Sequence, residues 1–219
     1  MQRLGVFARP PEAGKVKTRL SPALPARLAC DLYRGLLADA LAVAGMAAAE
    51  RYVYWSDTAS TDASDLARGF TAREQRGADL GARLDHAFAE LLPDPADRAV
   101  VIGADCPELE AREIAAAFAL LQSHDVALGP TSDGGYYLIG LRRPAPALFS
   151  DIAWGGDQVL NQTLDRAAVL NLSVAMLEPR EDVDTPADLV RLIARLAPGG
   201  AGAAHTRAAL RALGLLPAN

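Results

Sequence analysis

The chain has 219 residues, of which 51% are hydrophobic, and its formal net charge is −5 at pH 7. This length and composition are enough for one substantial core, and the acidic balance excludes a general binder of nucleic acid or of membrane surfaces. Two cysteines, Cys30 and Cys106, are too few for a disulfide framework, and no apolar stretch has the length of a signal peptide or membrane span. We therefore expect a soluble cytoplasmic protein with reduced thiols.

Short apolar runs bounded by turn residues alternate with helical patterns along the first 130 residues, which is typical of βαβ units and a mostly parallel sheet. In chain order, strands are predicted over Leu4–Ala8, Tyr52–Ser56, Phe70–Glu74, Ala99–Gly103 and Val126–Gly129. Helices are predicted over Ala23–Ala49, Leu80–Leu92 and Glu110–Gln122. The predicted fold class is a single α/β domain.

The pattern changes after Pro130. The run T-S-D-G-G-Y-Y-L-I-G-L, residues 131–141, predicts a turn and a strand with no helix before it, so an antiparallel strand is expected to join the sheet here. Further on, we predict a helix over Gln158–Ala168, a strand near Leu172–Leu177 and a helix beginning at Thr185 and Pro186, with Thr185 as N-cap. Residues 1–197 then form the main domain, and 198–219 a flexible joint with a short helix over Thr206–Leu213.

The loop after the first predicted strand holds the only two lysines, Lys15 and Lys17, among 22 Lys and Arg residues. Lysine is a compact point charge suited to phosphate oxygens, whereas arginine prefers planar bidentate partners. With Arg19 and the backbone amides near Gly14, these lysines follow a strand end, where open α/β sheets bind ligands. The loop is not a Walker A motif, because Val16 replaces the Ser or Thr that binds magnesium. It is a candidate diphosphate or triphosphate site, with a solvated loop as the alternative.

Acidic residues follow two other apolar segments. Asp105 emerges after V-V-I-G-A, where a carboxylate can hold magnesium or manganese together with substrate phosphates. The alternative is that Asp105 caps the helix after Pro107. Glu181, Asp182 and Asp184 precede a helix start, and the favourable effect of anions at a helix N-terminus explains one of these carboxylates better than three.

The turn before the reversed strand contains Asp133, Gly134 and Gly135, which would allow a ligand to approach the backbone closely, or simply form a tight hairpin. The remaining polar candidates are better explained without a site. The scattered histidines are expected at the surface or partly buried, and the acidic residues after the second strand in a solvated loop: His86, His124, His205, Asp57, Asp62 and Asp65.

Five stretches together resemble the successive motifs of the DUF2064 family, whose members are classed as glycosyltransferases: V-F-A-R-P-P-E-A-G-K-V-K-T-R-L, I-G-A-D-C-P, S-D-G-G-Y-Y-L-I-G-L, W-G-G-D-Q-V-L-N-Q-T and D-V-D-T-P-A-D-L. They extend from Val6 to Leu189. More distantly, the chain is similar to molybdenum cofactor nucleotidyltransferases and phospholactate guanylyltransferase. The resemblance implies a Rossmann-like three-layer sandwich of GT-A type, the nucleotide-diphospho-sugar transferase fold. It also implies a nucleotide over the first half of the sheet, with Mg²⁺ or Mn²⁺ near Asp105 and Asp184.

The same resemblance implies roles for particular residues. The loop from Gln75 to Arg83 would lie beside the base or ribose. The expected nucleotide contacts are Ala8, Gly14, Lys15, Lys17, Arg19, Gln75, Gly77, Asp79, Gly81 and Arg83. The expected catalytic residues are Asp105, Lys17, Arg19 and Asp133, the last as an acceptor-side residue or base. One departure concerns Trp154, which the family usually follows with a hydroxyl residue and this chain follows with Gly155.

Three functions fit these observations. The first is a metal-dependent transferase with a nucleotide-sugar donor, the second a nucleotidyltransferase that releases pyrophosphate, and the third a non-catalytic nucleotide-binding regulatory protein. We favour the first, because Pro10 and Pro11 stiffen the cationic loop and Gly14 is its only glycine, which suits a diphosphate better than an enveloped triphosphate. The expected partners are a nucleotide or nucleotide sugar and an unidentified small-molecule acceptor, and no binding to nucleic acid or membrane is expected. A homodimer is left open.

Overall fold

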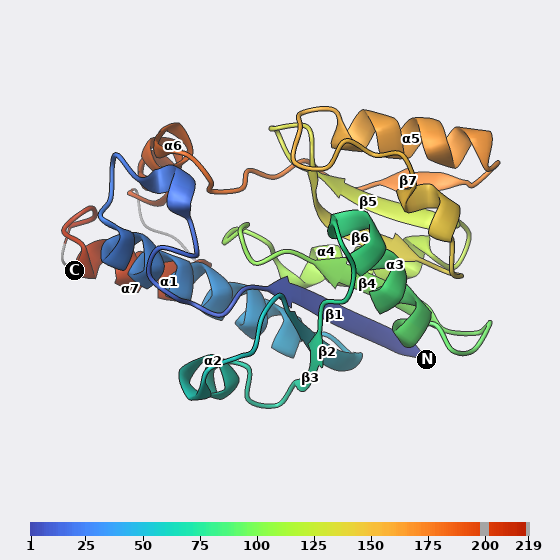
Figure 1. Ribbon diagram of the computed structural model, residues 1–219, viewed down its shortest axis with the longest axis horizontal. Helices are drawn as coiled ribbons and strands as arrows, with labels where there is room; N and C mark the ends of the chain where they lie inside the picture. Colours follow the sequence, from blue (N-terminus) through green and yellow to red (C-terminus); the bar gives the residue numbers. More distant parts are fainter. Residues whose placement is uncertain (198–201, 218–219) are drawn as a thin grey trace.

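The computed structural model describes residues 1–197 and 202–217, which form a central sheet with helices on both faces (Figure 1). The strands are β1 Gln2–Ala8, β2 Glu50–Trp55, β3 Thr71–Glu74, β4 Arg98–Ile102, β5 Val126–Pro130, β6 Tyr136–Leu141 and β7 Val174–Met176. The α-helices are α1 Ala26–Gly45, α2 Thr61–Leu66, α3 Leu80–Leu91, α4 Ala111–Leu120, α5 Val159–Val169, α6 Pro186–Leu196 and α7 Ala204–Ala212. Short 3₁₀ helices are η1 Thr18–Leu20 and η2 Pro146–Phe149.

The strand order is β3-β2-β1-β4-β6-β5-β7, and β6 runs against both of its neighbours while the remaining pairs are parallel. This confirms the predicted single α/β domain with a mostly parallel sheet and an antiparallel strand in its second half. Because the parallel strands share one direction, their carboxyl ends meet at one edge of the sheet, together with the amino end of β6. That edge is where ligands of open α/β sheets bind.

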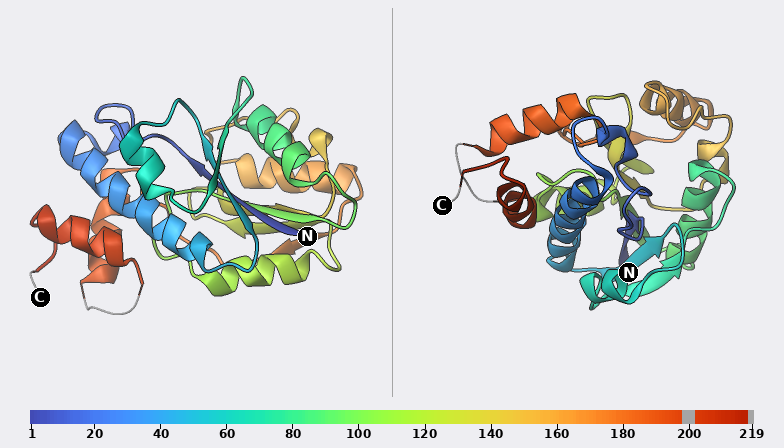
Figure 2. Two further views of the ribbon diagram at one scale, coloured as in Figure 1. Left: turned by 90° about the horizontal axis from the view of Figure 1, so that it is seen from below. Right: turned by 60° about the vertical axis from the view of Figure 1, so that its left-hand side comes forward.

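Alternating side chains of the strands build a core on each face of the sheet. Val53 and Trp55 of β2 pack in the core under α1 and α4, whereas Tyr54 between them packs in the core under α3 and α5. The views of Figure 2 show these helices on opposite sides of the sheet. The result is the three-layer arrangement that a buried, mostly parallel sheet requires.

The C-terminal helix α7 lies along α1, as both views of Figure 2 show. Asp39 of α1 is 5% exposed and accepts hydrogen bonds from the backbone N–H groups of His205 (3.0 Å) and Thr206 (2.8 Å), so it caps the first turn of α7. A helix cap of this kind contributes about 0.5–2 kcal/mol. Leu210 adds to a third core cluster with α1 and α6. The predicted joint falls largely on residues 198–201, which lie outside the described residues.

Some element boundaries differ from the prediction for local reasons. α1 begins at Ala26 instead of Ala23, because Pro25 occupies the N-cap position with an extended backbone. The expected polar loop after β2 contains the short helix α2, and the Ser60 side chain caps it by accepting the Ala63 N–H at 3.3 Å. The start of α6 is as predicted, with Thr185 as N-cap and Pro186 in the first turn. Within the described residues, no helix is long and apolar enough to cross a membrane.

Candidate functional site

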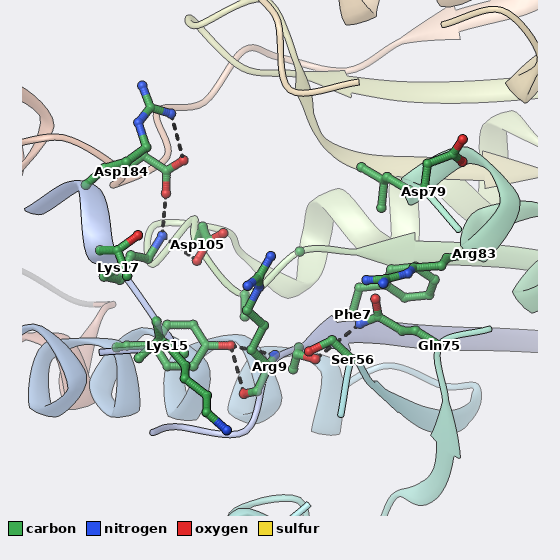
Figure 3. Close-up of a pocket in the computed structure, with 18 of the residues that line it drawn as sticks. Phe7, Arg9, Lys15, Lys17, Ser56, Gln75, Asp79, Arg83, Asp105 and Asp184 are labelled. Atoms are coloured by element: carbon green, nitrogen blue, oxygen red, sulfur yellow. Dashed lines mark hydrogen bonds and ion pairs between the residues drawn. The ribbon is translucent and has the colours of Figure 1, made fainter. Parts of the chain in front are cut away.

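A cavity of about 600 Å³ opens at the sheet edge where β1 and β4 end. Its walls come from the loops that follow β1, β2, β3 and β4, from the first residue of β6 and from the segment before α6. Figure 3 shows one side occupied by Lys17, Asp105 and Asp184, and the opposite side by Gln75, Asp79 and Arg83. The fold therefore brings residues from distant parts of the chain to one site.

Two carboxylates meet on the ammonium group of Lys17. The Nζ atom lies 2.6 Å from Oδ1 of Asp105 and 2.7 Å from Oδ1 of Asp184, and Nη1 of Arg19 lies 3.5 Å from Oδ2 of Asp184. The Lys17 side chain is only 4% exposed, whereas the two aspartates are 44% and 35% exposed. Burial opposes the charged form of Lys17, but the two carboxylates outweigh it and raise the pKa of the ammonium group. The group is a cation throughout the physiological range.

The loops that carry the two aspartates are joined to each other. The N–H of Val183 donates to the carbonyl oxygen of Asp105 at 3.1 Å, which ties the segment before α6 to the loop after β4. Asp105 does not cap the following helix, because Glu110 occupies that position with Glu113 as its capping-box partner. The helix-cap alternative for Asp105 is therefore wrong, and its carboxylate is turned to the cavity instead.

A buried network anchors the start of the segment that leads to Asp184. Glu113 of α4 is 6% exposed and accepts hydrogen bonds from Nε of Arg180 at 2.7 Å and from the hydroxyl of Tyr137 at 3.2 Å. The same hydroxyl is 3.1 Å from the carbonyl oxygen of Glu178. A buried carboxylate that is fully paired in this way fixes the backbone around it. It holds the segment in place before α6 begins.

Lys17 itself has a left-handed backbone, with φ 48° and ψ 37°. For a residue with a side chain this conformation costs about 1–2 kcal/mol. Such strained residues persist where surrounding contacts determine them, and they gather at ligand sites. Here the two ion pairs of Lys17 supply the compensating contacts.

Further acidic residues lie near the carboxylate pair. Burial, followed by the charges of Asp133 and Asp184, raises the pKa of Asp182 to about 7. Asp133 accepts hydrogen bonds through Oδ1 from the Thr131 hydroxyl (2.6 Å) and the Gly135 N–H (3.1 Å), so one of its oxygens belongs to the turn before β6. This region is thus rich in negative charge that a cationic ligand group can balance.

Gly134 in this turn is required by space as well as by conformation. Its φ is +90°, and a Cβ atom would lie 1.9 Å from the carbonyl oxygen of Asp157. The N–H of Leu160 also donates to the Gly134 carbonyl at 2.8 Å. The turn is therefore packed directly on the loop before α5, which explains Gly134 better than close approach of a ligand.

The other cations of the cavity differ in how they are paired. Lys15 binds Glu12 at 2.8 Å, and Figure 3 shows its side chain directed away from the carboxylate pair. Arg83 donates from Nε to the Gly77 carbonyl at 3.2 Å, and Arg9 forms no ion pair within the described residues. Figure 3 shows both guanidinium groups extending into the cavity. The cavity therefore has positive charge on the side away from Asp184.

The loop after β3 is attached to the ends of the neighbouring strands. Nε2 of Gln75 donates to the carbonyl oxygens of Ala8 (3.1 Å) and Tyr54 (2.8 Å). Asp79 is the N-cap of α3 and accepts the N–H of Ala82 at 2.8 Å. Gly81 lies outside the cavity, where a Cβ atom would come within 2.6 Å of Trp154 Nε1. Gly81 allows α3 to pack closely on the loop before α5.

The structure thus brings together most of the residues singled out in the sequence. Those that line the cavity are Ala8, Lys15, Lys17, Arg19, Gln75, Asp79, Arg83, Asp105 and Asp184. Those that do not line it are Gly14, Gly77, Gly81 and Asp133. Sequence reasoning missed several lining residues, which include Phe7, Arg9, Tyr33 and Ser56. Arg9 could have been found, because it directly follows a strand at the ligand-binding edge.

Comparisons with known proteins identify the family. A family profile described as an uncharacterized protein conserved in bacteria (DUF2064) matches residues 37–156. The chain belongs to the DUF2064 family. No curated protein matches the chain.

Solved structures extend the likeness to nearly the full length. The crystal structure of a protein from Desulfovibrio desulfuricans G20, provisionally designated a nucleotide-diphospho-sugar transferase, is 32% identical with a TM-score of 0.87, over 98% of this chain and 96% of that one. A CMP:2-keto-3-deoxy-manno-octonic acid synthetase in complex with CTP is 15% identical with a TM-score of 0.58, over 90% and 98%. The manganese complex of Rv0371C from Mycobacterium tuberculosis H37Rv is 20% identical with a TM-score of 0.52, over 88% and 98%. The last two show a shared fold.

Proposed function

We propose that this DUF2064 protein is a metal-dependent glycosyltransferase that uses a nucleotide-sugar donor. The observation that carries the proposal is that Asp105 and Asp184 meet at the sheet edge, in one cavity with the guanidinium groups of Arg9 and Arg83. A nucleoside diphosphate needs both features, because its phosphates require cations and its divalent metal requires carboxylates. The 32% identical D. desulfuricans protein, provisionally designated a nucleotide-diphospho-sugar transferase, supports this choice.

The donor set fits magnesium or manganese. Within the described residues there is no cluster of three or more His, Cys, Asp or Glu side chains that could enclose a metal ion alone. Mg²⁺ is commonly held by one or two carboxylates and completes its shell with phosphates and water. Asp105 and Asp184 would offer these carboxylates once the Lys17 ammonium group, which bridges them here, turns to the phosphates. When bound there, such an ion would neutralise charge on the diphosphate leaving group.

Other residues of the cavity and its surroundings would bind the nucleotide, stabilise the leaving group and contact the acceptor. Lys17 and Arg19 lie beside the carboxylate pair and would stabilise negative charge that develops on the leaving diphosphate. Gln75, with its amide nitrogen committed to two backbone carbonyls, presents Oε1 as an acceptor for a nucleotide N–H or O–H group. Asp133 would lie on the acceptor side, with Oδ2 left to accept a proton or hydrogen bond.

Nucleotidyl transfer is the second candidate, and a specific observation favours it. Arg9 and Arg83 have no carboxylate partner within the described residues, so the cavity has cations for a third phosphate. In that reaction an acceptor phosphate oxygen would attack the α-phosphorus of a nucleoside triphosphate, and the bond to the β-phosphate oxygen would break to release pyrophosphate. The fold is shared with a synthetase solved in complex with CTP.

The product distinguishes these reactions. The protein is incubated with manganese and either a panel of nucleotide sugars or nucleoside triphosphates with phosphorylated acceptors, and the phosphorus products are identified by ³¹P NMR. We expect slow release of nucleoside diphosphate from a nucleotide sugar. Pyrophosphate that appears only with a phosphorylated acceptor would replace glycosyl with nucleotidyl transfer. Nucleotide binding without either product, over a broad acceptor panel, would favour the regulatory protein.

A further inference from the structure

Arg9 and Arg83 are the cations of the cavity that have no carboxylate partner within the described residues, and of the two Arg83 donates to the Gly77 carbonyl oxygen. Lys15 is paired with Glu12, while Lys17 and Arg19 share Asp105 and Asp184. Arg9 has no ion pair, and no acceptor for its guanidinium group, within residues 1–197 and 202–217. The group nevertheless extends into the cavity (Figure 3). An unpaired guanidinium in a cavity is matched best by a planar or tetrahedral oxyanion.

The backbone of Arg9 is held by a buried hydroxyl group. Tyr33 of α1 is 4% exposed, and its hydroxyl accepts the Arg9 N–H at 2.9 Å and donates to the Arg9 carbonyl oxygen at 3.1 Å. β1 ends at Ala8, so both polar groups of Arg9 lie beyond the strand and depend on this one side chain. Burial, together with the nearby charge of Asp105, raises the pKa of the Tyr33 hydroxyl, which therefore stays protonated as the donor.

Pro10 restricts Arg9 further. The residue before a proline is confined mainly to extended conformations, and the proline itself has a fixed φ. Because the Tyr33 hydroxyl also binds both the N–H and the carbonyl oxygen of Arg9, the position and direction of the Arg9 Cα–Cβ bond are fixed. A cation that is positioned before the ligand arrives loses less conformational entropy on binding.

We propose that the guanidinium group of Arg9 binds the phosphate groups of the nucleotide, and that Tyr33 is the residue that positions Arg9. This rests on the proposed function, since it names how the same cavity recognises its anionic substrate. It applies equally to a diphosphate and a triphosphate. The two lysines that stand out in the sequence are already paired with carboxylates, whereas the guanidinium group of Arg9 can bind the phosphates without a competing carboxylate.

A double-mutant cycle tests this proposal. The affinity of a nucleoside diphosphate, with manganese present, is measured by calorimetry for the wild type, Arg9→Gln, Tyr33→Phe and the double variant. We expect Arg9→Gln to weaken binding about 10- to 100-fold, the range for a lost charged hydrogen-bonding group. Tyr33→Phe should weaken it about threefold to tenfold in the wild-type background but less than twofold when Arg9 is already replaced. Arg9→Lys should recover part of the loss, because it restores charge without the bidentate geometry.

The matched control is Tyr54→Phe, which also removes a buried tyrosine hydroxyl, one that binds Glu90 at 3.1 Å. It should leave nucleotide affinity unchanged. Equal effects of Tyr33→Phe in both backgrounds would show a purely structural tyrosine, and wild-type affinity in Arg9→Gln would show that phosphate binds elsewhere; either overturns the inference. If the wild type binds no nucleotide at all, the proposed function fails and this inference fails with it.

Discussion

Asp105→Asn is expected to remove the manganese dependence of nucleotide binding while the protein stays folded. In the wild type, manganese should tighten nucleoside diphosphate binding, and in the variant the affinities with and without manganese should become equal. The physical reason is that an amide oxygen lacks the negative charge with which a carboxylate holds a divalent cation. Loss of a direct ligand should weaken manganese affinity by about 100-fold, at least as much as the loss of an outer-shell partner.

The fold should survive because Lys17 keeps its second partner, Asp184, at 2.7 Å. Calorimetric titrations with and without manganese, alongside a thermal melt, measure both properties. Asp62→Asn is a suitable control, because Asp62 is exposed on α2 and lies outside the cavity. If Asp105→Asn lowers the melting temperature while the manganese effect persists, Asp105 has a structural role and is not a metal ligand.

Lys17→Met is expected to have effects of opposite sign on metal and nucleotide. Without nucleotide, the variant should bind manganese about tenfold or more tightly than the wild type. The Lys17 ammonium now lies between the two carboxylates that the metal needs, and its removal leaves two like charges that a divalent ion can balance. Nucleoside diphosphate without metal should bind about tenfold more weakly, since one charged hydrogen-bond donor is lost.

Free manganese can be counted by electron paramagnetic resonance, and stabilisation by manganese alone can be followed by thermal shift, because a ligand of the folded state raises its stability. Lys15→Met serves as the control, because Lys15 is 67% exposed and is paired with Glu12. Manganese affinity that stays at the wild-type value in Lys17→Met would mean that Lys17 does not occupy the position of the metal. Methionine suits the left-handed backbone no worse than lysine, so the backbone cost is matched.

The sequence predicts much of the fold because its signals are local. The apolar runs of β1 and β4, the cap at Thr185 and the double glycine before β6 each depend on a few neighbouring residues. The structure confirms the single α/β domain and the antiparallel strand that these signals predict. The short helix α2 was missed, because its acidic and small residues are typical of a solvated loop.

The arrangement of the candidate site is less accessible from the sequence. The edge rule for parallel sheets brings Asp105 and Asp184 to the same region, but it does not reveal that Lys17 lies between them. Nor does it reveal the hydroxyl of Tyr33 on Arg9, because that contact depends on how α1 packs against β1. Conversely, Gly81 looks like part of a nucleotide loop, and only the tertiary structure shows Trp154 packed against it. Contacts between segments that are distant in the sequence can be found only from the three-dimensional structure.

A crystal structure with manganese and a nucleoside diphosphate would show whether the metal and the phosphates share the cavity at the end of β1 and β4. We expect an anomalous manganese peak at coordination distance from the carboxylates of Asp105 and Asp184. The diphosphate should touch this ion and the guanidinium group of Arg9, with the base near Gln75. A manganese peak away from both aspartates, or a nucleotide bound outside this cavity, would show that this cavity is not the shared metal and nucleotide site.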